Sequence, residues 1–238
     1  MATMQALRLP SIMALLESVH AVILDLDGTL VDTLGDFELA LRAMLADLGA
    51  PSDKADRGFI GNTVGKGSEY LVQQTLRHVG LADDNPALFE RAIDRYQHHY
   101  GLINGQASEL FPGAVQGVSA LRARGLKLAC LTNKPSRYAR DLLTLKGLAT
   151  QFDEIFGGDA FARKKPDPLP LIETCRALGH DPAQTLMVGD SLNDAQAGHA
   201  AGCRVVLVSY GYNHGRPITE VPASAYIDRL DALPLLLP

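Results

Sequence analysis

The hydrophobic positions of this chain fall into short continuous runs and into stretches with helical spacing. The run Ala21 to Leu24 is apolar throughout and predicts a buried strand. Further apolar runs lie at 126–131, 152–156, 185–188 and 204–208, and amphipathic helical segments lie between them at 136–145, 168–178 and 192–201. Strands that alternate with helices are typical of βαβ units. We therefore predict an α/β fold, with a Rossmann-like parallel sheet as its core and helices on both faces.

Residues 35–109 have a different pattern, with helical spacing and no long strand. Amphipathic helices are predicted at 35–48, at 68–79 with Ser68 as its cap, and from Pro86 to Tyr100. The glycine-rich link 61–67 separates the first two helices. This pattern indicates a helical module inserted into the α/β fold. We expect three parts: an N-terminal extension at 1–18, the core domain at 19–33 and 110–238, and an α-helical cap domain at 34–109.

Composition and charge limit the classes of partner. An apolar content of 47% in 238 residues is enough for a substantial core. The net charge is -5 and the basic residues are scattered, which argues against a nucleic-acid partner. No apolar run reaches the roughly eighteen residues of a membrane span. We expect a monomer or homodimer that acts on a small molecule, with no nucleic-acid or membrane partner.

The cysteines bear on the cellular compartment. Cys130, Cys175 and Cys203 are odd in number, widely spaced and without a C-x-x-C pair. Reduced thiols in the core are the best interpretation, and a cytoplasmic location is the expectation.

Polar side chains follow the ends of the predicted strands. Parallel strands present their carboxyl ends at one edge, so these side chains are expected to gather there. They are Asp25 and Asp27 after the first strand, Thr132 and Asn133 after the second, Asp190 after the fourth with Asp194 one helical turn later, and Lys164 or Lys165 before a helix. Such an oxygen-rich set suits Mg²⁺, and the hydroxyl, amide and ammonium groups suit a phosphate.

Each of these residues alone also has a structural interpretation. Asp25-x-Asp27 before a glycine is often a turn, Asp194 can cap a helix, and Lys165 can be a solvated surface lysine. Two carboxylates at i and i+2 of a strand face the same space and repel each other. The repulsion is relieved by a divalent cation or by protonation of one carboxyl group. The combination of all of these residues in this order favours a functional site over the separate structural interpretations.

The motifs D-x-D-G-T at 25–29, T-N at 132–133, K-P at 165–166 and G-D-S-x-x-D at 189–194 resemble those of the haloacid dehalogenase superfamily of phosphohydrolases, in order and spacing. The resemblance covers nearly the whole chain after residue 18. More narrowly, segments 30–33, 60–62, 165–168 and 210–213 resemble bacterial phosphoglycolate phosphatases.

This resemblance implies a Mg²⁺-dependent phosphatase for a small phosphorylated metabolite, which the narrower resemblance identifies as 2-phosphoglycolate. It implies that Asp25 is the nucleophile that becomes an aspartyl phosphate, and that Asp27 is the general acid and base. The resemblance further implies that Mg²⁺ is held by Asp25, the backbone carbonyl of Asp27 and Asp190, that Thr132, Asn133 and Lys165 complete the catalytic set, and that Asp194 orients Lys165 or a metal-bound water.

Two points stay open. The link 61–67 is the candidate segment for binding the substrate's carboxylate, through Gly61, Asn62 and Lys66. Lys66 can equally be a solvated lysine in a hinge. For the activity, the alternatives are another phosphohydrolase of the superfamily, a phosphosugar mutase, or a non-hydrolytic phosphate- or metal-binding module.

Overall fold

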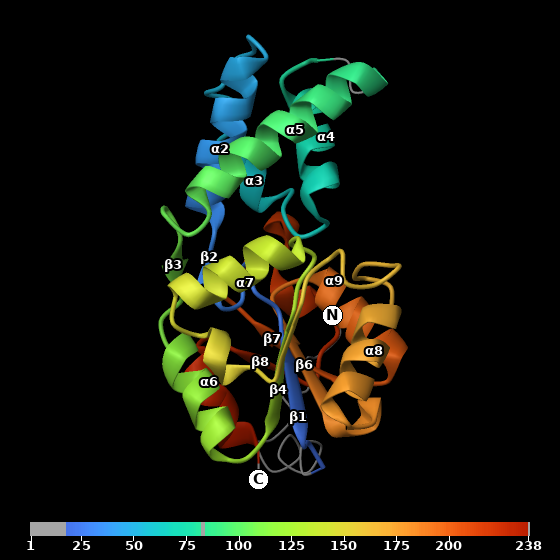
Figure 1. Ribbon diagram of the computed structural model, residues 1–238. Helices are drawn as coiled ribbons and strands as arrows, with labels where there is room; N and C mark the ends of the chain where they lie inside the picture. Colours follow the sequence, from blue (N-terminus) through green and yellow to red (C-terminus); the bar gives the residue numbers. More distant parts are fainter. Residues whose placement is uncertain (1–17, 82–83, 238) are drawn as a thin grey trace, which may run out of the picture.

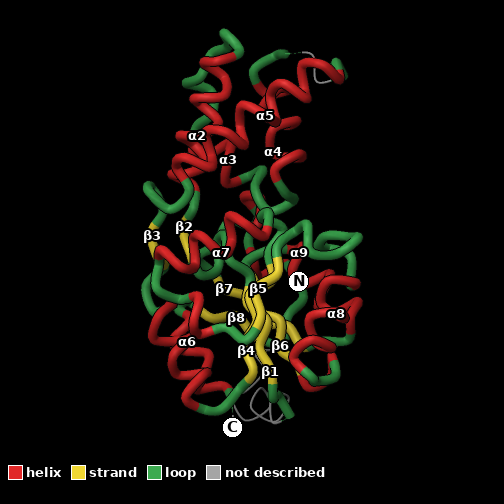
Figure 2. The backbone as a smooth tube through the Cα atoms, viewed as in Figure 1, coloured by secondary structure: helices red, strands yellow, loops and turns green. Residues whose placement is uncertain are grey.

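The computed structural model describes residues 18–81 and 84–237, so most of the expected N-terminal extension lies outside the described residues. Its centre is a six-stranded sheet in the order β5-β4-β1-β6-β7-β8, in which every neighbouring pair is parallel. The strands are β1 (Ala21–Leu24), β4 (Lys127–Leu131), β5 (Glu154–Phe156), β6 (Thr185–Gly189), β7 (Arg204–Val208) and β8 (Ala225–Ile227). Figure 2 shows them gathered in the lower half of the molecule. The predicted Rossmann-like α/β fold is confirmed.

Helices cover both faces of this sheet (Figure 1). The helices α6 (Ala114–Ala123) and α7 (Ser136–Leu145) pack with the C-terminal 3-10 segment η5 (Leu230–Leu236) on one face, and α8 (Leu169–Leu178) and α9 (Leu192–Ala201) pack on the other.

Strand β1 shows how its sequence builds both layers. Val22 and Leu24 belong to the apolar cluster under α6 and α7, whereas Ala21 and Ile23 belong to the cluster under α8 and α9. This alternation follows from the two-residue period of a strand. Because both faces are covered, all four residues are apolar and fully buried.

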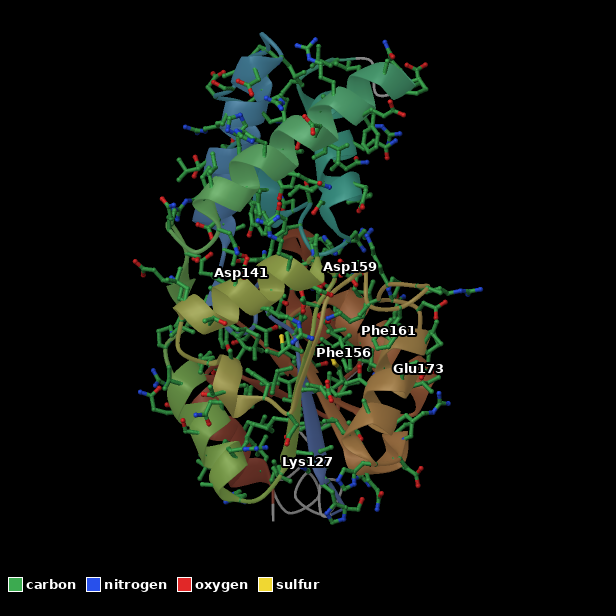
Figure 3. The ribbon with its side chains drawn as sticks, in the orientation of Figure 1. Lys127, Asp141, Phe156, Asp159, Phe161 and Glu173 are labelled. Carbon is green, nitrogen blue, oxygen red and sulfur yellow. The ribbon has the colours of Figure 1, made fainter. Side chains whose placement is uncertain are left out.

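Aromatic packing extends the second cluster at the α8 side of the sheet. The rings of Phe156 and Phe161 lie 5.0 Å apart between their centroids, and Figure 3 shows both labelled side chains beside α8.

Four helices lie beyond the carboxyl edge of the sheet (Figure 1), and we call them the cap helices. They are α2 (Leu34–Asp47), α3 (Arg57–Gly61), α4 (Ser68–His78) and α5 (Pro86–Ile103). They share an apolar cluster of their own, which includes Phe37, Leu41, Leu76, Tyr96 and Tyr100. The short α3 was not predicted, and Gly67 rather than Ser68 is the N-cap residue of α4.

A two-stranded antiparallel ribbon joins the cap helices to the sheet. It pairs β2 (Val31–Asp32) with β3 (Glu109–Leu110), side by side in Figure 1. The expected ends of the cap domain, residues 34 and 109, lie at this ribbon, and the division into domains stays a prediction. None of the helices in the described part of the chain is long and apolar enough to cross a membrane.

A buried carboxylate holds the two connections together. Asp36 is fully buried at the start of α2, and its two oxygens accept hydrogen bonds of 2.7 Å from the amides of Gly105 and Ala107. A Cβ atom on Gly35 would lie 2.1 Å from the carbonyl oxygen of Ala107, so the chain approaches this closely because residue 35 is glycine. Asp36 therefore joins the start of α2 to the segment that follows α5.

The replacement Asp36→Ala is expected to lower the free energy of unfolding by about 3 kcal/mol, because each amide left without an acceptor costs roughly 1 to 3 kcal/mol. Equilibrium urea denaturation measures this change. The matched control Asp141→Ala removes an exposed carboxylate of α7 (Figure 3) and should leave the free energy of unfolding nearly unchanged. Similar losses in the two variants would refute the role of Asp36.

Candidate active site

The loop after β1 turns two carboxylates toward the cap helices. The sheet pairing continues through Asp25, whose amide donates to the carbonyl of Val188 over 2.9 Å. The chain then folds back, since the amide of Val31 donates to the carbonyl of Leu26 over 3.0 Å, and Gly28 turns the chain at a φ of 84°. This turn places Asp25 at the end of the central strand of the sheet.

Asp190 follows β6, the neighbour of β1, and is held by one hydroxyl and one backbone amide. Its Oδ1 accepts a hydrogen bond of 3.1 Å from the Thr29 hydroxyl, and its Oδ2 accepts one of 2.8 Å from the amide of Tyr212. A Cβ atom on Gly28 would lie 2.4 Å from Asp190 Oδ2, and one on Gly211 would lie 2.1 Å from Asp190 Cβ. Both positions require glycine for the backbone to approach the carboxylate.

Lys165 places one ammonium among these carboxylates. Its side chain is only 2% exposed, and its Nζ lies 2.7 Å from Asp194 Oδ1 and 3.0 Å from Asp25 Oδ1. The ammonium donates to Asp194 and to the carbonyl of Leu131, so Asp25 Oδ1 is near a positive charge but accepts no hydrogen bond. Asp25 Oδ1 is therefore buried with lone pairs that no hydrogen bond uses.

The electrostatics of this cluster follow from burial. Burial raises the pKa of Asp25 to about 7, although Lys165 acts in the opposite direction. Burial, and then repulsion from Asp194 and Asp25, raises the pKa of Asp190 well above its usual value. Burial by itself lowers the pKa of Lys165, but Asp194 and Asp25 outweigh it and raise that pKa above its usual value. One ammonium is thus shared by two carboxyl groups, Asp25 and Asp194, and Asp190 lies beside them with no cation of its own among the described residues.

This donor set fits a divalent cation. Oxygen atoms of Asp25, Asp190 and Asp194 lie within 4.8 Å of one another, and oxygen ligands are those that hard cations prefer. Both oxygens of Asp194 are already used, Oδ1 by Lys165 and Oδ2 by the amide and hydroxyl of Ser191. Asp25 and Asp190 are therefore the better placed ligands, and Asp194 holds the ammonium in position.

The side chain of Asp27 has a partner that was not predicted. Its Oδ1 lies 2.8 Å from the Nζ of Lys134, whose side chain is 2% exposed. The Nζ also lies 4.6 Å from the ring centroid of Phe37 and 4.9 Å from that of Tyr100. The signal in the sequence was its place, since Lys134 follows Thr132 and Asn133 at the end of β4.

Core and cap residues line one cavity, which we call the central cavity. The empty space between its lining residues is about 430 Å³ when the open mouth is counted. The core contributes Asp25, Asp27, Thr132, Asn133, Lys134 and Pro135, and the cap side contributes Phe37, Val64, Gly65, Gly67, Ser68, Leu71, Tyr96 and Tyr100.

The side chain of Asn133 contacts backbone on both sides of the site, and its predicted catalytic role stays a prediction. Its Nδ2 donates to the carbonyls of Gly65 and Lys165 over 2.9 and 2.8 Å, and its Oδ1 accepts from the amide of Lys165 over 3.0 Å. Both amide hydrogens and the oxygen are therefore engaged with backbone. Asn133 positions Lys165 and the link 61–67, whereas Thr132 lines the cavity and its hydroxyl oxygen accepts a hydrogen bond from the amide of Lys134.

The two adjacent lysines have separate places. Lys165 is buried beside Asp25, whereas Lys164 is partly exposed and forms an ion pair of 2.9 Å with Glu69 of α4. Lys165, not Lys164, is therefore the lysine beside Asp25.

Gly61, Asn62 and Lys66, the candidate residues for binding the substrate's carboxylate, do not line the central cavity. Lys66 lies over the ring of Tyr70, with 5.0 Å from its Nζ to the centroid, and it lines a separate cavity together with Asn62. The link enters the central cavity through Gly65 and Gly67 instead. The reason is the path of the backbone, because Gly65 is fixed to Asn133 and Lys66 then points to the other side.

Comparisons with known proteins agree with this geometry. The profile of the haloacid dehalogenase-like hydrolases matches residues 19–202. The chain is 43% identical over 219 residues to a phosphoglycolate phosphatase of Thiobacillus denitrificans, which covers 92% of this chain and 96% of that protein. It is 42% identical over 217 residues to a plasmid-encoded phosphoglycolate phosphatase of Cupriavidus necator, with 91% and 92% covered.

A solved structure is also similar. A crystal structure described as a predicted phosphoglycolate phosphatase from Haemophilus somnus superposes with a TM-score of 0.86 at 32% identity, and covers 91% of this chain and 96% of that one.

Mg²⁺ is expected to raise the melting temperature of chelator-treated protein, and by more at about pH 8 than at about pH 5.5. The pKa values of Asp25 and Asp190 in the folded protein lie above those of ordinary carboxyl groups, so acid protonates them while the protein is folded. Protons then compete with the cation, and its stabilising effect is lost as the pH falls. Thermal melts with and without the cation measure the difference.

The variant Asp190→Asn should lose most of this shift, and the control Glu173→Gln, which changes a carboxylate on α8 (Figure 3), should keep it. A shift that is equal in both variants, or larger at the lower pH, would rule out the site.

Proposed function

The chain belongs to the haloacid dehalogenase-like hydrolases, and from this premise we propose that it is a Mg²⁺-dependent phosphatase that converts 2-phosphoglycolate to glycolate and phosphate. That it hydrolyses phosphoric monoesters follows from the family and from relatives that are about 40% identical over most of the chain. The observation that carries the proposal is Asp25, a buried carboxylate with an unbonded oxygen, placed between Lys165 and the wall of a small cavity.

In the first step, the Asp25 carboxylate attacks the phosphorus atom, and the bond between phosphorus and the ester oxygen breaks with its electron pair passing to that oxygen. Asp27, which lines the same cavity, gives a proton to the departing oxygen. The products of this step are glycolate and an aspartyl phosphate on Asp25. In the second step, Asp27 takes a proton from water, and the water oxygen displaces Asp25 from phosphorus.

The remaining residues hold the phosphoryl oxygens. The Lys165 ammonium, 3.0 Å from Asp25 Oδ1, and the Thr132 hydroxyl are placed to bind them. Asp194 and the carbonyl of Leu131 accept hydrogen bonds from the ammonium, and Asn133 accepts one from the backbone amide of Lys165. A Mg²⁺ ion held by Asp25, Asp190 and the backbone carbonyl of Asp27 would supply the positive charge that an anion needs to approach a phosphate dianion.

The identity of the substrate, the oligomeric state and the cellular location belong to the proposal as well. The relatives are named as phosphoglycolate phosphatases, which supports 2-phosphoglycolate as the substrate. The state of monomer or homodimer, the cytoplasmic location, and the absence of nucleic-acid and membrane partners stay predictions. The three cysteines are buried as free thiols, which supports the predicted reduced state.

A panel of phosphate esters tests the proposed activity. 2-Phosphoglycolate, ethyl phosphate, p-nitrophenyl phosphate and hexose phosphates are assayed with Mg²⁺ and with a chelator. The highest kcat/KM is expected for 2-phosphoglycolate, with no turnover in the chelator. Isomerisation of a hexose phosphate faster than any hydrolysis would point to a mutase instead.

The two aspartates are expected to differ in their dependence on the leaving group. Asp25→Asn should abolish turnover and leave the fold intact, because the amide keeps the shape and removes the attacking charge. Asp27→Asn should slow ethyl phosphate more than p-nitrophenyl phosphate, since proton transfer is worth on the order of 10² to 10⁴ in rate and a nitrophenolate needs little of it. Steady-state kinetics on both esters, with circular dichroism as the check on folding, measure this. Substantial activity in Asp25→Asn, or equal losses for the two esters in Asp27→Asn, would contradict these roles.

A further inference from the structure

Resting on the proposed function, we propose that Lys134 and Tyr100 form the subsite that binds the carboxylate of the substrate and so set the preference for 2-phosphoglycolate. Lys134 belongs to the core and Tyr100 to α5, and both line the central cavity. The subsite therefore lies where the cap helices meet the core.

Lys134 has unused hydrogen-bonding capacity. An ammonium carries three N–H donors. Within residues 18–81 and 84–237, Asp27 is the one hydrogen-bond acceptor of this ammonium, at 2.8 Å. The rings of Phe37 and Tyr100 flank it and offer only their π faces, at 4.6 and 4.9 Å. A buried ammonium with one acceptor can bind a second anion without losing the first.

Tyr100 supplies a second donor that has no partner. Its hydroxyl is buried and makes no hydrogen bond within the described residues, although its ring packs against Phe37 and Tyr96 at 5.5 Å each. A buried hydroxyl without a partner is unfavourable, so such a group in a cavity is accounted for by a ligand that accepts its hydrogen bond. Burial also raises the pKa of Tyr100 well above its usual value, so the hydroxyl keeps its proton and remains a donor.

The position of Lys134 matches the connectivity of the substrate. In 2-phosphoglycolate, one methylene group separates the ester oxygen from the carboxylate carbon. The group that protonates the ester oxygen must therefore be close to the group that binds the carboxylate. Asp27 has the first role in the proposed reaction, and Lys134 is its direct neighbour at 2.8 Å. The phosphate lies at Asp25 and Lys165, and the carboxylate extends from there toward Lys134 and Tyr100.

Two rival interpretations make different predictions. Lys134 could serve only to hold Asp27 in place, in which case its loss would slow every ester to a similar degree. The carboxylate could instead be bound by Lys66, which lies on Tyr70 in the separate cavity. The ratio of kcat/KM for two substrates that differ only in the carboxylate separates these cases, because any effect through Asp27 cancels in the ratio.

The experiment measures kcat and KM of the full-length, Mg²⁺-loaded enzyme for 2-phosphoglycolate and for ethyl phosphate, in which a methyl group replaces the carboxylate. In Lys134→Met, the kcat/KM ratio of the two substrates is expected to fall roughly 10- to 100-fold toward ethyl phosphate, as for the loss of a charged hydrogen bond. In Tyr100→Phe, which keeps the ring and removes only the hydroxyl, a fall of roughly 2- to 10-fold is expected, mainly through KM.

Lys66→Met is measured beside them as the variant of the rival site, and thermal melts show that each variant is folded. An unchanged ratio in Lys134→Met, or a selective loss in Lys66→Met instead, overturns the assignment. Tyr100→Phe keeps the test decisive if Lys134→Met does not fold, since an unchanged ratio in that variant also overturns it. If the wild-type enzyme itself shows no preference for 2-phosphoglycolate over ethyl phosphate, the proposed substrate fails and this subsite fails with it. A preference that survives in Lys134→Met, by contrast, refutes the subsite alone.

Discussion

The structure depends on one buried ion-pair cluster, in which the ammonium of Lys165 lies between Asp25 and Asp194. Buried charges are tolerated when they are paired and hydrogen-bonded, and removal of one partner typically leaves a destabilising charge behind. The three residues come from the end of β1, from the loop before α8 and from the first turn of α9. A parallel sheet brings such segments together because the carboxyl ends of its strands share one edge. The parallel sheet therefore determines both the fold and the position of this ion-pair cluster.

The cap helices complete this site chemically as well as sterically. They bring aromatic rings rather than charges to the central cavity, so the contact between Asp27 and Lys134 lies in apolar surroundings where electrostatic attraction is stronger than in water. Two amide side chains of the core, Asn133 and Asn193, donate to the same carbonyl oxygen, that of Gly65, at 2.9 and 3.3 Å. The link 61–67 is thus fixed to Asn133, which also positions Lys165.

Much of this site could be predicted from the sequence, because its residues follow strands whose apolar runs are easy to recognise. Asp25, Thr132 and Asp190 lie where the ends of β1, β4 and β6 were expected to place them. The pattern could not show that Lys134 is buried, since a lysine after a strand is normally solvated and its surroundings come from Phe37 and Tyr100, far away in the chain.

The pattern of hydrophobic and polar residues also could not predict where side chains in loops point. The sequence left Lys66 open between a carboxylate-binding residue and a solvated lysine, and in the structure Gly65 is held by hydrogen bonds while Lys66 lines a separate cavity. Asn133 was expected in the catalytic set, and only the structure shows that its amide is engaged with the backbone of Lys165 and Gly65. Contacts between distant segments decide both cases, whereas local spacing decides the strands and helices.

The central claim is that Asp25 carries the phosphoryl group during the reaction. The most direct measurement is an acid quench during a single turnover of 2-phosphoglycolate, followed by peptide mapping with mass spectrometry. The account predicts a phosphoryl group on the peptide that contains Asp25, which hydroxylamine removes as it does from acyl phosphates. A phosphoryl group trapped on any other residue, or an Asp25 peptide that stays unmodified throughout the time course, contradicts it.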